Sequence, residues 1–518
     1  YLNDATLWGG EPVDPYMNED AHNYIKPIRE LLRSEDYAGA DSLIRQVQGS
    51  FSQSYSPLGT LKLNFGHDPT KVVDYRRHLD LNKAIADVSY THDGTNYNRQ
   101  YFISHPDSVM VIHLQSSARG QLNFSIDFES LLSYNKTPSG STLEVDGYAP
   151  YICEPHYRFD IKDPVKYDES RGIHFANLIS IKDTDGAVTH DGTTLSLSDA
   201  THAQILISIE TSFNGYDKDP VREGKPYKII ARDQLLRAST LSFDELIEHH
   251  LDDYSGLFDR LDFRLQQKDP LSLPTDERLK RYSQGKEDKE LEELYFHFGR
   301  YLMIASSRTP EVPINLQGIW NPYLQPPWSS NYTTNINVEE NYWLAEVANL
   351  SECHVPLLSW IKNVATTGAV SAKTFYGARG WSVGHNSDIW AMSNPVGDFG
   401  KGSPAWANWT MGGAWLGTHL WEHYLFSQDR TYLQEEAYPL MKGAAQFCVD
   451  MMVRDQNAKW VTSPGTSPEN IYITPEGYHG ATLYGSTSDL ALCRETFLNT
   501  ITAAEILNTD RTFIKELQ

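Results

Sequence analysis

Cysteine, positive charge and long apolar runs are scarce in this sequence. Its 518 residues include 4 cysteines, at positions 153, 353, 448 and 493. They show neither metal-ligand spacing nor the surroundings of a nucleophile, so we expect buried thiols. Lys and Arg number 44 against 68 Asp and Glu, a net charge of −24, which argues against nucleic acid or an anionic membrane surface as a partner. No apolar run reaches about 18 residues, so no membrane span is expected.

Length and composition predict a multidomain globular protein. The chain is too long for one ordinary domain, and a hydrophobic content of 40% is enough for a sizeable core. It begins inside a motif, at Tyr1, without a recognisable signal peptide. Any export signal is therefore expected to have been removed.

Residues 1–262 are predicted to form a β-rich domain. Leu61, Leu63 and Phe65 alternate with polar residues at the period of a strand, and turn signals separate the strands that follow. The other predicted strands are 84–90, 109–114, 173–181, 194–197 and 203–209. Many short strands at this spacing indicate a large β-sandwich.

The sequence changes to the longer period of helices after about residue 231. Ser242-Phe-Asp-Glu-Leu is typical of a helix cap, whereas residues 263–290 are polar, contain Pro270 and Pro274, and are interpreted as a helical or polar linker. Residues 291–518 are predicted to be helical. The expected helices are one from Leu291, then 337–348, 351–374, 410–426, 429–453, 486–507 and a short one near Phe513.

The segment Glu311–Leu350 has an unusual composition for a connection. It holds three tryptophans, seven asparagines and a proline pair, and proline favours an ordered loop before the next helix. Asn335 and Asn337 lie at the loop-to-helix junction, where an asparagine can simply cap the helix. The two amides can equally hold a water molecule or a sugar hydroxyl, because each offers a donor and an acceptor.

Several ordered motifs identify a family resemblance. NLQGIWN, PPW, NINxxxNYWxAExxNL, GGAWL and SPEN occur in this order. Together they resemble glycoside hydrolase family 95, which contains inverting exo-α-L-fucosidases and related α-L-galactosidases, and the similarity covers nearly all of the chain. The resemblance implies an N-terminal β-supersandwich, a helical linker and an (α/α)6 barrel.

The expected barrel is longer than the sequence that remains for it. Twelve barrel helices with their loops need roughly 300 residues, whereas residues 291–518 number 228 (518 − 290). We therefore expect an incomplete, C-terminally truncated barrel in this chain. The C-terminal β-domain that is common in the family is expected to be absent.

Inverting glycoside hydrolysis needs a proton donor and a base for the attacking water. By resemblance, Glu469 in SPEN matches the general acid of the family. Pro464 and Pro468 are expected to stiffen its loop, and Trp460 and Tyr472 to desolvate the carboxyl and raise its pKa. Composition alone favours the alternative of a loop glutamate exposed to water.

The assignment of residues that hold the attacking water rests on the resemblance to the family. Asn335 and Asn337 match two asparagines that orient the nucleophilic water. An amide is a poor base, so a carboxylate must polarise the pair, and in the family this Asp lies beyond the present sequence. No base residue is named, and severely impaired catalysis is expected if these 518 residues act alone.

Other residues are candidates for the sugar subsite. His385 and Asp388 lie in HNSD, which resembles the HN-x-D loop of the family, and Trp409 precedes the glycines of MGGAW, where the backbone can approach closely. Packing or a local turn explains each of these three residues equally well. Ten of the twelve tryptophans lie between Trp320 and Trp421, and stacking on a sugar is expected for at least one of them.

Thr333 bears on specificity. Most fucosidases of the family have a histidine two residues before the first asparagine, where this chain has Thr333. L-fucose is L-galactose without the O6 hydroxyl, so threonine leaves volume and a hydroxyl partner for O6. We expect α-L-galactosides as preferred substrates, with α-L-fucosides slower. The alternatives are an α-L-fucosidase of the same mechanism and a plain loop role for Thr333.

Two other functional classes stay open. A carbohydrate-binding protein would keep the aromatic cleft without a base. A generic glycosidase or lyase would use two carboxylates, namely Glu339, Glu340 or Asp388 together with Glu469. No cofactor, metal ion, nucleic acid or membrane span is expected. The expected partner is an oligo- or polysaccharide of plant or host origin, which implies a secreted or periplasmic bacterial protein.

Overall fold

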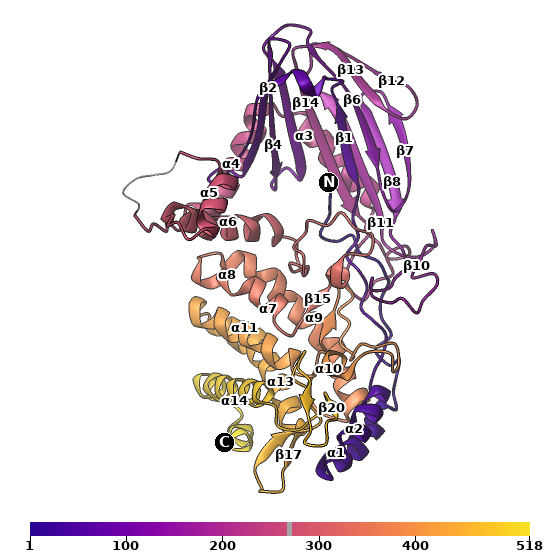
Figure 1. Ribbon diagram of the computed structural model, residues 1–518, viewed down its shortest axis with the longest axis vertical. Coiled ribbons are helices and arrows are strands. Elements are labelled where there is room, and N and C mark those ends of the chain that lie inside the picture. Colours follow the sequence, from indigo (N-terminus) through magenta and orange to yellow (C-terminus); the bar gives the residue numbers. More distant parts are fainter. Residues whose placement is uncertain (267–271) are drawn as a thin grey trace.

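The computed structural model describes residues 1–266 and 272–518, with a β-sandwich at one end and a set of helices at the other (Figure 1). The larger sheet has eight strands in the order β2-β3-β4-β5-β14-β11-β8-β7. They are β2 (Val72–Asp80), β3 (Ile85–His92), β4 (Thr95–Ser104), β5 (Val109–Ser116), β7 (Ser133–Ser139), β8 (Thr142–Tyr148), β11 (His174–Lys182) and β14 (His202–Thr211). The smaller sheet has the order β1-β6-β13-β12, formed by β1 (Thr60–Asn64), β6 (Leu122–Glu129), β12 (Ala187–His190) and β13 (Leu195–Ala200).

Burial explains which face of each strand is apolar. Phe124 and Ile126 of β6 are buried, while Ser125 between them is half-buried, because only one face of the smaller sheet meets the core. In β14, Ile205 packs in the core between the sheets, whereas Leu206 packs in a second cluster that includes Leu235. Both faces of this central strand are therefore covered.

Two helices supply the second layer on the larger sheet, α3 (Tyr227–Ser239) and α4 (Phe243–Phe258). The predicted cap of α4 is confirmed, since the Ser242 side chain accepts from the Glu245 N–H and the Glu245 carboxylate accepts from the Ser242 N–H. The predicted strands near 60–65, 84–90, 109–114, 173–181, 194–197 and 203–209 are confirmed as β1, β3, β5, β11, β13 and β14. Strand β2 was not predicted, because most of its residues are exposed and give no alternating pattern.

The segment 21–47 differs from the predicted β-rich domain. It forms α1 (Ile25–Arg33) and α2 (Tyr37–Leu43), which lie against the helical part, well away from the sheets (Figure 1). Ile28 and Leu32 of α1 are buried in a cluster with Phe375 and Phe447. The apolar stripe of α1 thus finds its partner more than three hundred positions away, which the local pattern cannot show.

The linker region contains α5 (Thr275–Ser283) and leads into α6 (Lys289–Ser306). The Asp288 carboxylate caps α6 by accepting from the Leu291 N–H, and it also accepts from Arg278 of α5 at 2.6 Å. Pro270, which contributed to the linker prediction, lies outside the described residues.

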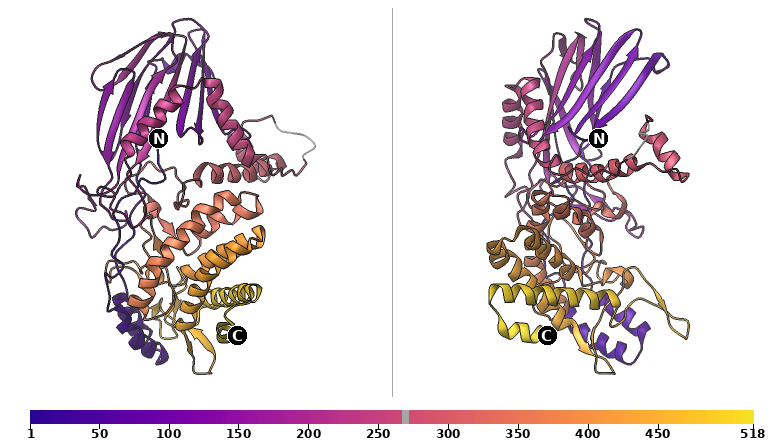
Figure 2. Two further views of the ribbon diagram at one scale, coloured as in Figure 1. Left: turned by 180° about the vertical axis from the view of Figure 1, so that it is seen from behind. Right: turned by 90° about the vertical axis from the view of Figure 1, so that its left-hand side faces the viewer.

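The helical part follows the predicted order. Its helices are α7 (Asn337–Tyr342), α8 (Leu344–Val347), α9 (Ser351–Tyr376), α10 (Pro404–Ala407), α11 (Gly412–Ser427), α12 (Arg430–Tyr432), α13 (Tyr438–Met451), α14 (Thr487–Leu507) and α15 (Arg511–Leu517). The predicted helix 429–453 is broken by a π-helical segment at Leu433–Ala437, and the predicted helix 337–348 is divided into α7 and α8. Helices α9, α11, α13 and α14 pack against one another in succession (Figure 2). Closure into an (α/α)6 barrel stays a prediction.

Four short two-stranded ribbons lie in the loops of the described residues. They are β9 (Ile152–Cys153) with β10 (Val165–Lys166), β15 (Tyr332–Thr333) with β16 (Asn386–Ser387), β17 (Met452–Arg454) with β18 (Trp460–Thr462), and β19 (Tyr472–Ile473) with β20 (His479–Gly480). One hydrophobic core runs through both ends of the molecule. Where the two parts meet, the ring of Tyr332 lies 5.0 Å from that of Trp8 and 5.0 Å from that of Trp360. Aromatic contacts thus join the N-terminal segment to the helical part.

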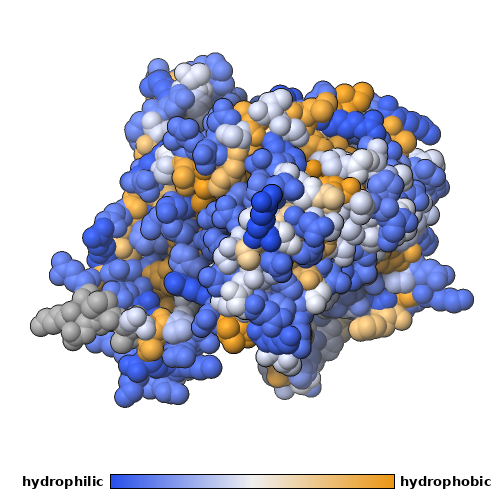
Figure 3. Space-filling model, turned by 90° about the horizontal axis from the view of Figure 1, so that it is seen from above, coloured by the Kyte–Doolittle hydropathy of each residue, from blue (hydrophilic) through white to orange (hydrophobic). Residues whose placement is uncertain are grey.

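The surface agrees with the acidic composition. Viewed from the sandwich end, it is mostly hydrophilic with scattered apolar patches (Figure 3). Within the described ranges, the helices are too short or too polar to cross a lipid bilayer. All four cysteines are buried and free, which confirms the expected thiols.

Candidate active site

A two-residue ribbon brings the asparagine loop and the His385 loop together. Thr333 of β15 pairs with Asn386 of β16, and the Thr334 N–H donates to the His385 carbonyl at 2.9 Å. Because Asn335 follows Thr334 directly, this pairing holds the first asparagine beside the His385 loop.

The N-terminus of α11 closes against the same ribbon. A Cβ atom on Gly412 would lie 2.9 Å from both the Thr334 hydroxyl oxygen and the Val383 carbonyl, and one on Gly413 would lie 2.9 Å from the ring of Trp381. The two glycines of GGAW are therefore explained by close packing within the protein.

Capping, the alternative explanation of the two asparagines, is not observed. Helix α7 begins at Asn337, Ile336 occupies the N-cap position, and no side chain caps the helix there. Both asparagines are half-buried. The Oδ1 atom of Asn335 is buried without a hydrogen-bond partner in the described part of the chain. A water molecule or a sugar hydroxyl would satisfy this oxygen, and water positioning stays the prediction for both residues.

His385 and Glu469 lie close together. The Nε2 atom of His385 is 4.0 Å from Oε1 of Glu469, and Nδ1 is 3.0 Å from Oδ1 of Asn386. Burial lowers the pKa of His385 to about 4, with the bond to Asn386 opposing the shift. The imidazole is thus neutral near pH 7 and donates from Nδ1, so Nε2 presents a lone pair towards the acid.

The expected desolvation of Glu469 by Trp460 and Tyr472 is wrong. The Glu469 side chain is 65% exposed. Trp460 instead lies under the Arg454 guanidinium at 4.2 Å, and the Tyr472 hydroxyl donates to the Thr482 carbonyl at 2.6 Å. Trp460 and Tyr472 each contact another group, so neither ring covers the Glu469 carboxyl.

Thr333 belongs to a buried polar network. Its hydroxyl donates to Oδ1 of Asn331 at 2.7 Å, which also accepts from Asn386 at 3.3 Å, while the Asn331 amide donates to the Ser52 hydroxyl at 2.7 Å. The Thr333 hydroxyl proton is therefore already used. Its lone pairs are what the residue can offer to a ligand hydroxyl.

Asp388 has a structural role that replaces the predicted sugar contact. Its side chain is fully buried, and its carboxylate accepts from the backbone N–H groups of Gln53 at 2.8 Å and Trp390 at 3.0 Å. Burial raises its pKa to about 6 against these backbone bonds. The carboxylate holds the N-terminal segment against the His385 loop.

Trp409 is also packed rather than exposed. It is 2% exposed, and it lies by Asp489, a buried carboxyl whose pKa burial raises to about 7 while Ser486, Thr462 and Trp409 oppose the shift. A Cβ atom on Gly465 would lie 2.6 Å from the Asp489 carboxylate. Trp409 and Asp489 therefore lie beneath the loop that carries Glu469, and a direct sugar contact of Trp409 stays a prediction.

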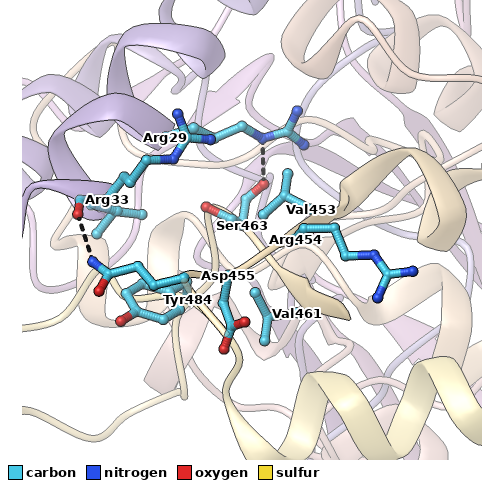
Figure 4. A pocket seen from close by; sticks show the side chains of 10 residues that line it. Arg29, Arg33, Val453, Arg454, Asp455, Val461, Ser463 and Tyr484 are labelled. Atoms are coloured by element: carbon cyan, nitrogen blue, oxygen red, sulfur yellow. Dashed lines mark hydrogen bonds between the residues drawn. The ribbon is translucent and has the colours of Figure 1, made fainter. Parts of the chain in front are cut away.

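The N-terminal helices hold the loop at residues 463–482, which carries Glu469 and is called the acid loop below. Arg29 of α1 donates to the Ser463 carbonyl at 2.7 Å and to the Asp450 carbonyl at 3.1 Å, beside a cavity of about 40 Å³ (Figure 4). Asp41 of α2 accepts from the N–H groups of Ala481 and Thr482 at 3.0 and 2.7 Å. In sequence, Glu469 lies between Ser463 and Ala481, the two positions that these hydrogen bonds hold.

A loop from the sandwich reaches the same site, and sequence reasoning missed it. The ring of Tyr157 lies 6.2 Å from that of Trp406, which lies 5.7 Å from the ring of His385. Burial raises the pKa of Tyr157, and the charge of Glu469 adds to the shift. Arg158 donates to Asp398 of the helical part at 2.8 Å. The only local signal is a short aromatic and basic run in a loop, which is too common to mark a site.

Family models match the two parts separately. The glycosyl hydrolase family 95 catalytic domain matches residues 242–518, and the glycosyl hydrolase family 65 N-terminal domain matches residues 1–216. The chain belongs to glycosyl hydrolase family 95.

Curated relatives agree with the family 95 assignment, and a solved structure shares the fold. Alpha-L-fucosidase 2 of Arabidopsis thaliana is 33% identical over 523 residues, covering 98% of this chain and 61% of that protein. A probable alpha-fucosidase A of Aspergillus niger is 28% identical over 508 residues, covering 93% and 60%. The chain thus spans about three fifths of the length of these relatives. A structure provisionally assigned as a kojibiose phosphorylase from the human microbiome has a TM-score of 0.59 at 10% identity, covering 90% of this chain and 59% of that one, which shows a shared fold.

The alternative of a second carboxylate near the asparagines finds no support in this family 95 chain. Glu339 is fully buried, and neither carboxylate oxygen has a partner in the described residues. Burial raises its pKa well above the usual value. Glu340 is exposed.

Glu346, His354 and His423 form the group with metal-ligand spacing in the part of the chain that the structure describes. The Glu346 Oε1 atom lies 2.8 Å from His354 Nδ1 and 2.7 Å from His423 Nδ1. Burial alone would raise the Glu346 pKa, but the bonds to both histidines lower it to about 2. These bonds satisfy the three groups and fasten α8, α9 and α11 together. The sequence analysis assigned no metal site, although the spacing of His419 and His423 was a signal for side chains on one helix face.

Arg29→Ala should loosen the acid loop. Removal of the guanidinium leaves two backbone carbonyls unpaired, so we expect a loss of about 1–3 kcal/mol in the free energy of unfolding. Hydrogen exchange in residues 463–482 should become faster. Arg33→Ala, an exposed change at the end of the same helix, serves as the control. Equal effects of the two changes in urea unfolding and in exchange would show that Arg29 does not brace the loop.

The stability of this family 95 chain should fall with pH below about 6.5, partly through His385. Its pKa of about 4 in the fold is below the unfolded value, so the unfolded chain binds more protons between these two pH values. The stabilisation is complete above pH 6.5 and declines by roughly 1.4 kcal/mol per pH unit towards pH 4. Urea unfolding at several pH values should show a flatter decline for His385→Asn, but not for the exposed control His190→Asn. Parallel declines for His385→Asn and the unaltered protein would contradict the assignment.

Proposed function

We propose that the protein is an inverting, exo-acting glycoside hydrolase that removes terminal α-L-galactosyl residues, and α-L-fucosyl residues more slowly, from glycans. The observation that carries the proposal is the cluster around His385. One ribbon sets Asn335, with its unpaired amide oxygen, beside the His385 loop, and His385 lies 4.0 Å from Glu469. Membership of family 95 and likeness to proteins named as fucosidases support the reaction class.

The proposed chemistry divides between the two sides of this cluster. Glu469 protonates the glycosidic oxygen of the leaving group, and the lone pair on His385 Nε2 orients the acidic proton. Asn335 and Asn337 hold a water molecule on the opposite face of the sugar. By family resemblance, an Asp of the barrel activates this water, and none of the residues named here is proposed as that base. The complete (α/α)6 barrel and a secreted or periplasmic location are part of the same proposal.

Specificity for L-galactose rests on Thr333. Because its hydroxyl proton is bound by Asn331, its lone pairs can accept a hydrogen bond from the O6 hydroxyl of L-galactose. L-fucose has a methyl group at this position and leaves the lone pairs unpaired.

A carbohydrate-binding function is the second candidate, and the exposure of Glu469 favours it. A side chain that is 65% exposed is not held in the dry environment that raises a carboxyl pKa for general-acid catalysis.

Glu469→Gln should separate these two functions. Loss of the general acid lowers kcat on a natural glycoside by roughly 10²–10⁴-fold and leaves ligand affinity unchanged. Kinetics and the anomer first released, followed by NMR, give the readout. Glu476→Gln, an exposed change in the same loop region, is the control. Carbohydrate binding without any turnover, by an unaltered protein that includes the base carboxylate, would favour the second candidate.

Thr333→Val should reduce the preference for L-galactose. The change keeps the side-chain shape and removes the oxygen, so we expect roughly a tenfold lower kcat/KM on p-nitrophenyl α-L-galactoside and a nearly unchanged value on the fucoside. Faster cleavage of the fucoside by the unaltered protein would make the galactosidase assignment wrong and leave the α-L-fucosidase alternative.

A further inference from the structure

The turn at Pro327–Ser330 is strained in a way that exposes a tryptophan. Trp328, Ser329 and Ser330 have φ values of 49°, 59° and 44°, in the left-handed region that non-glycine residues rarely adopt. Ser329 and Ser330 are buried, but Trp328 is 60% exposed. Three consecutive strained residues destabilise the fold and persist where the surrounding structure enforces them.

Surrounding hydrogen bonds enforce this turn. The Ser330 hydroxyl donates to Oδ1 of Asn315 at 2.8 Å and accepts from the Gln317 N–H at 3.1 Å. The Tyr55 N–H donates to the Ser329 carbonyl at 2.9 Å. These hydrogen bonds therefore hold the Trp328 ring in water, although burial of that ring would be favourable.

Trp328 stands at the outer end of a line of rings that leads to the acid. Its ring lies 6.3 Å from that of His156, and the next residue, Tyr157, lies 6.2 Å from Trp406. Trp406 in turn lies 5.7 Å from His385, which is 4.0 Å from Glu469. We define Trp328, His156, Tyr157 and Trp406 as the aromatic track.

The sandwich loop in this track is held rigid. Arg158 is buried, donates to Asp160 and Asp398 at 2.8 Å each, and lies 4.8 Å over the ring of Phe51. The two rings that precede Arg158 are therefore positioned before any ligand arrives, which reduces the entropy cost of binding.

We propose that the aromatic track binds the neutral oligosaccharide on the leaving-group side of the cleaved bond. The acid protonates the oxygen between the terminal sugar and the rest of the glycan, so sugars that continue past Glu469 meet the track. Flat aromatic faces match the apolar faces of pyranose rings, and no carboxylate of the substrate is needed. This inference rests on the proposed function for the position of the acid, and it names an oligosaccharide of several neutral units as the ligand.

Binding measured by calorimetry in the Glu469→Gln background tests the track. The probes are free L-galactose and a neutral trisaccharide that ends in an α-L-galactosyl unit, with the matching L-fucose pair as a second set. We expect the trisaccharide to bind about tenfold more tightly than the monosaccharide. Trp328→Ala should abolish this gain and leave monosaccharide affinity unchanged, and Trp328→Phe should keep most of it.

Two further variants make the test specific. Trp328→Gly removes the ring and also relieves the positive φ, so the melting temperature should be retained or raised while the gain in affinity is lost. Trp343→Ala, at another tryptophan that is 53% exposed, should leave both affinities unchanged.

The outcomes separate this inference from the proposed function. A trisaccharide gain that depends on Trp328, in a protein without hydrolytic activity, would support the track and overturn the proposed hydrolysis. Hydrolysis with equal affinities for the two probes, or with a trisaccharide gain that survives Trp328→Ala, would overturn the track and leave the hydrolysis intact.

Discussion

The pairing of β15 with β16 is the contact on which the site depends. It joins Thr333 to Asn386 across more than fifty positions of sequence and sets Asn335 and His385 side by side. The network of Asn331, Thr333 and Asn386 pairs part of the polar groups around the ribbon. An unpaired polar group at this depth would cost about 1–3 kcal/mol. Among the described residues, the Asn335 amide oxygen, the Tyr332 and Ser387 hydroxyls and His385 Nε2 are buried without a partner, so the Asn335 oxygen is one of several atoms that a water molecule or a ligand would satisfy.

Neither part of the molecule builds the cleft alone. The helical part supplies the asparagines, His385 and the acid loop, whereas the sandwich supplies Tyr157. The N-terminal helices cross to the helical part and hold the acid loop through Arg29 and Asp41. The candidate site residues of this family 95 chain are thus held by contacts with residues from distant positions.

Burial divides the carboxyl groups near the asparagines and the His385 loop into enclosed and exposed ones. Asp388 and Asp489 are enclosed and have raised pKa values of about 6 and 7, and burial raises the pKa of Glu339 well above its usual value. The Glu469 side chain, by contrast, is 65% exposed, and its role as the proton donor stays a prediction.

The sequence by itself predicted six strands of the two sheets, the order of the long helices after residue 291, the capping box of α4 and the family motifs that carry Asn335, Asn337 and Glu469. These features depend on local spacing, because the strand period, the helix period and a three-residue cap are properties of neighbouring positions. Only the tertiary structure decided that Asp388 and Trp409 are buried, that Thr333 donates to Asn331, that α1 and α2 leave the sandwich, and that Trp328 is held in water. Burial and hydrogen bonding in these cases join residues that lie far apart in sequence, and no local pattern encodes which distant segment will cover a side chain.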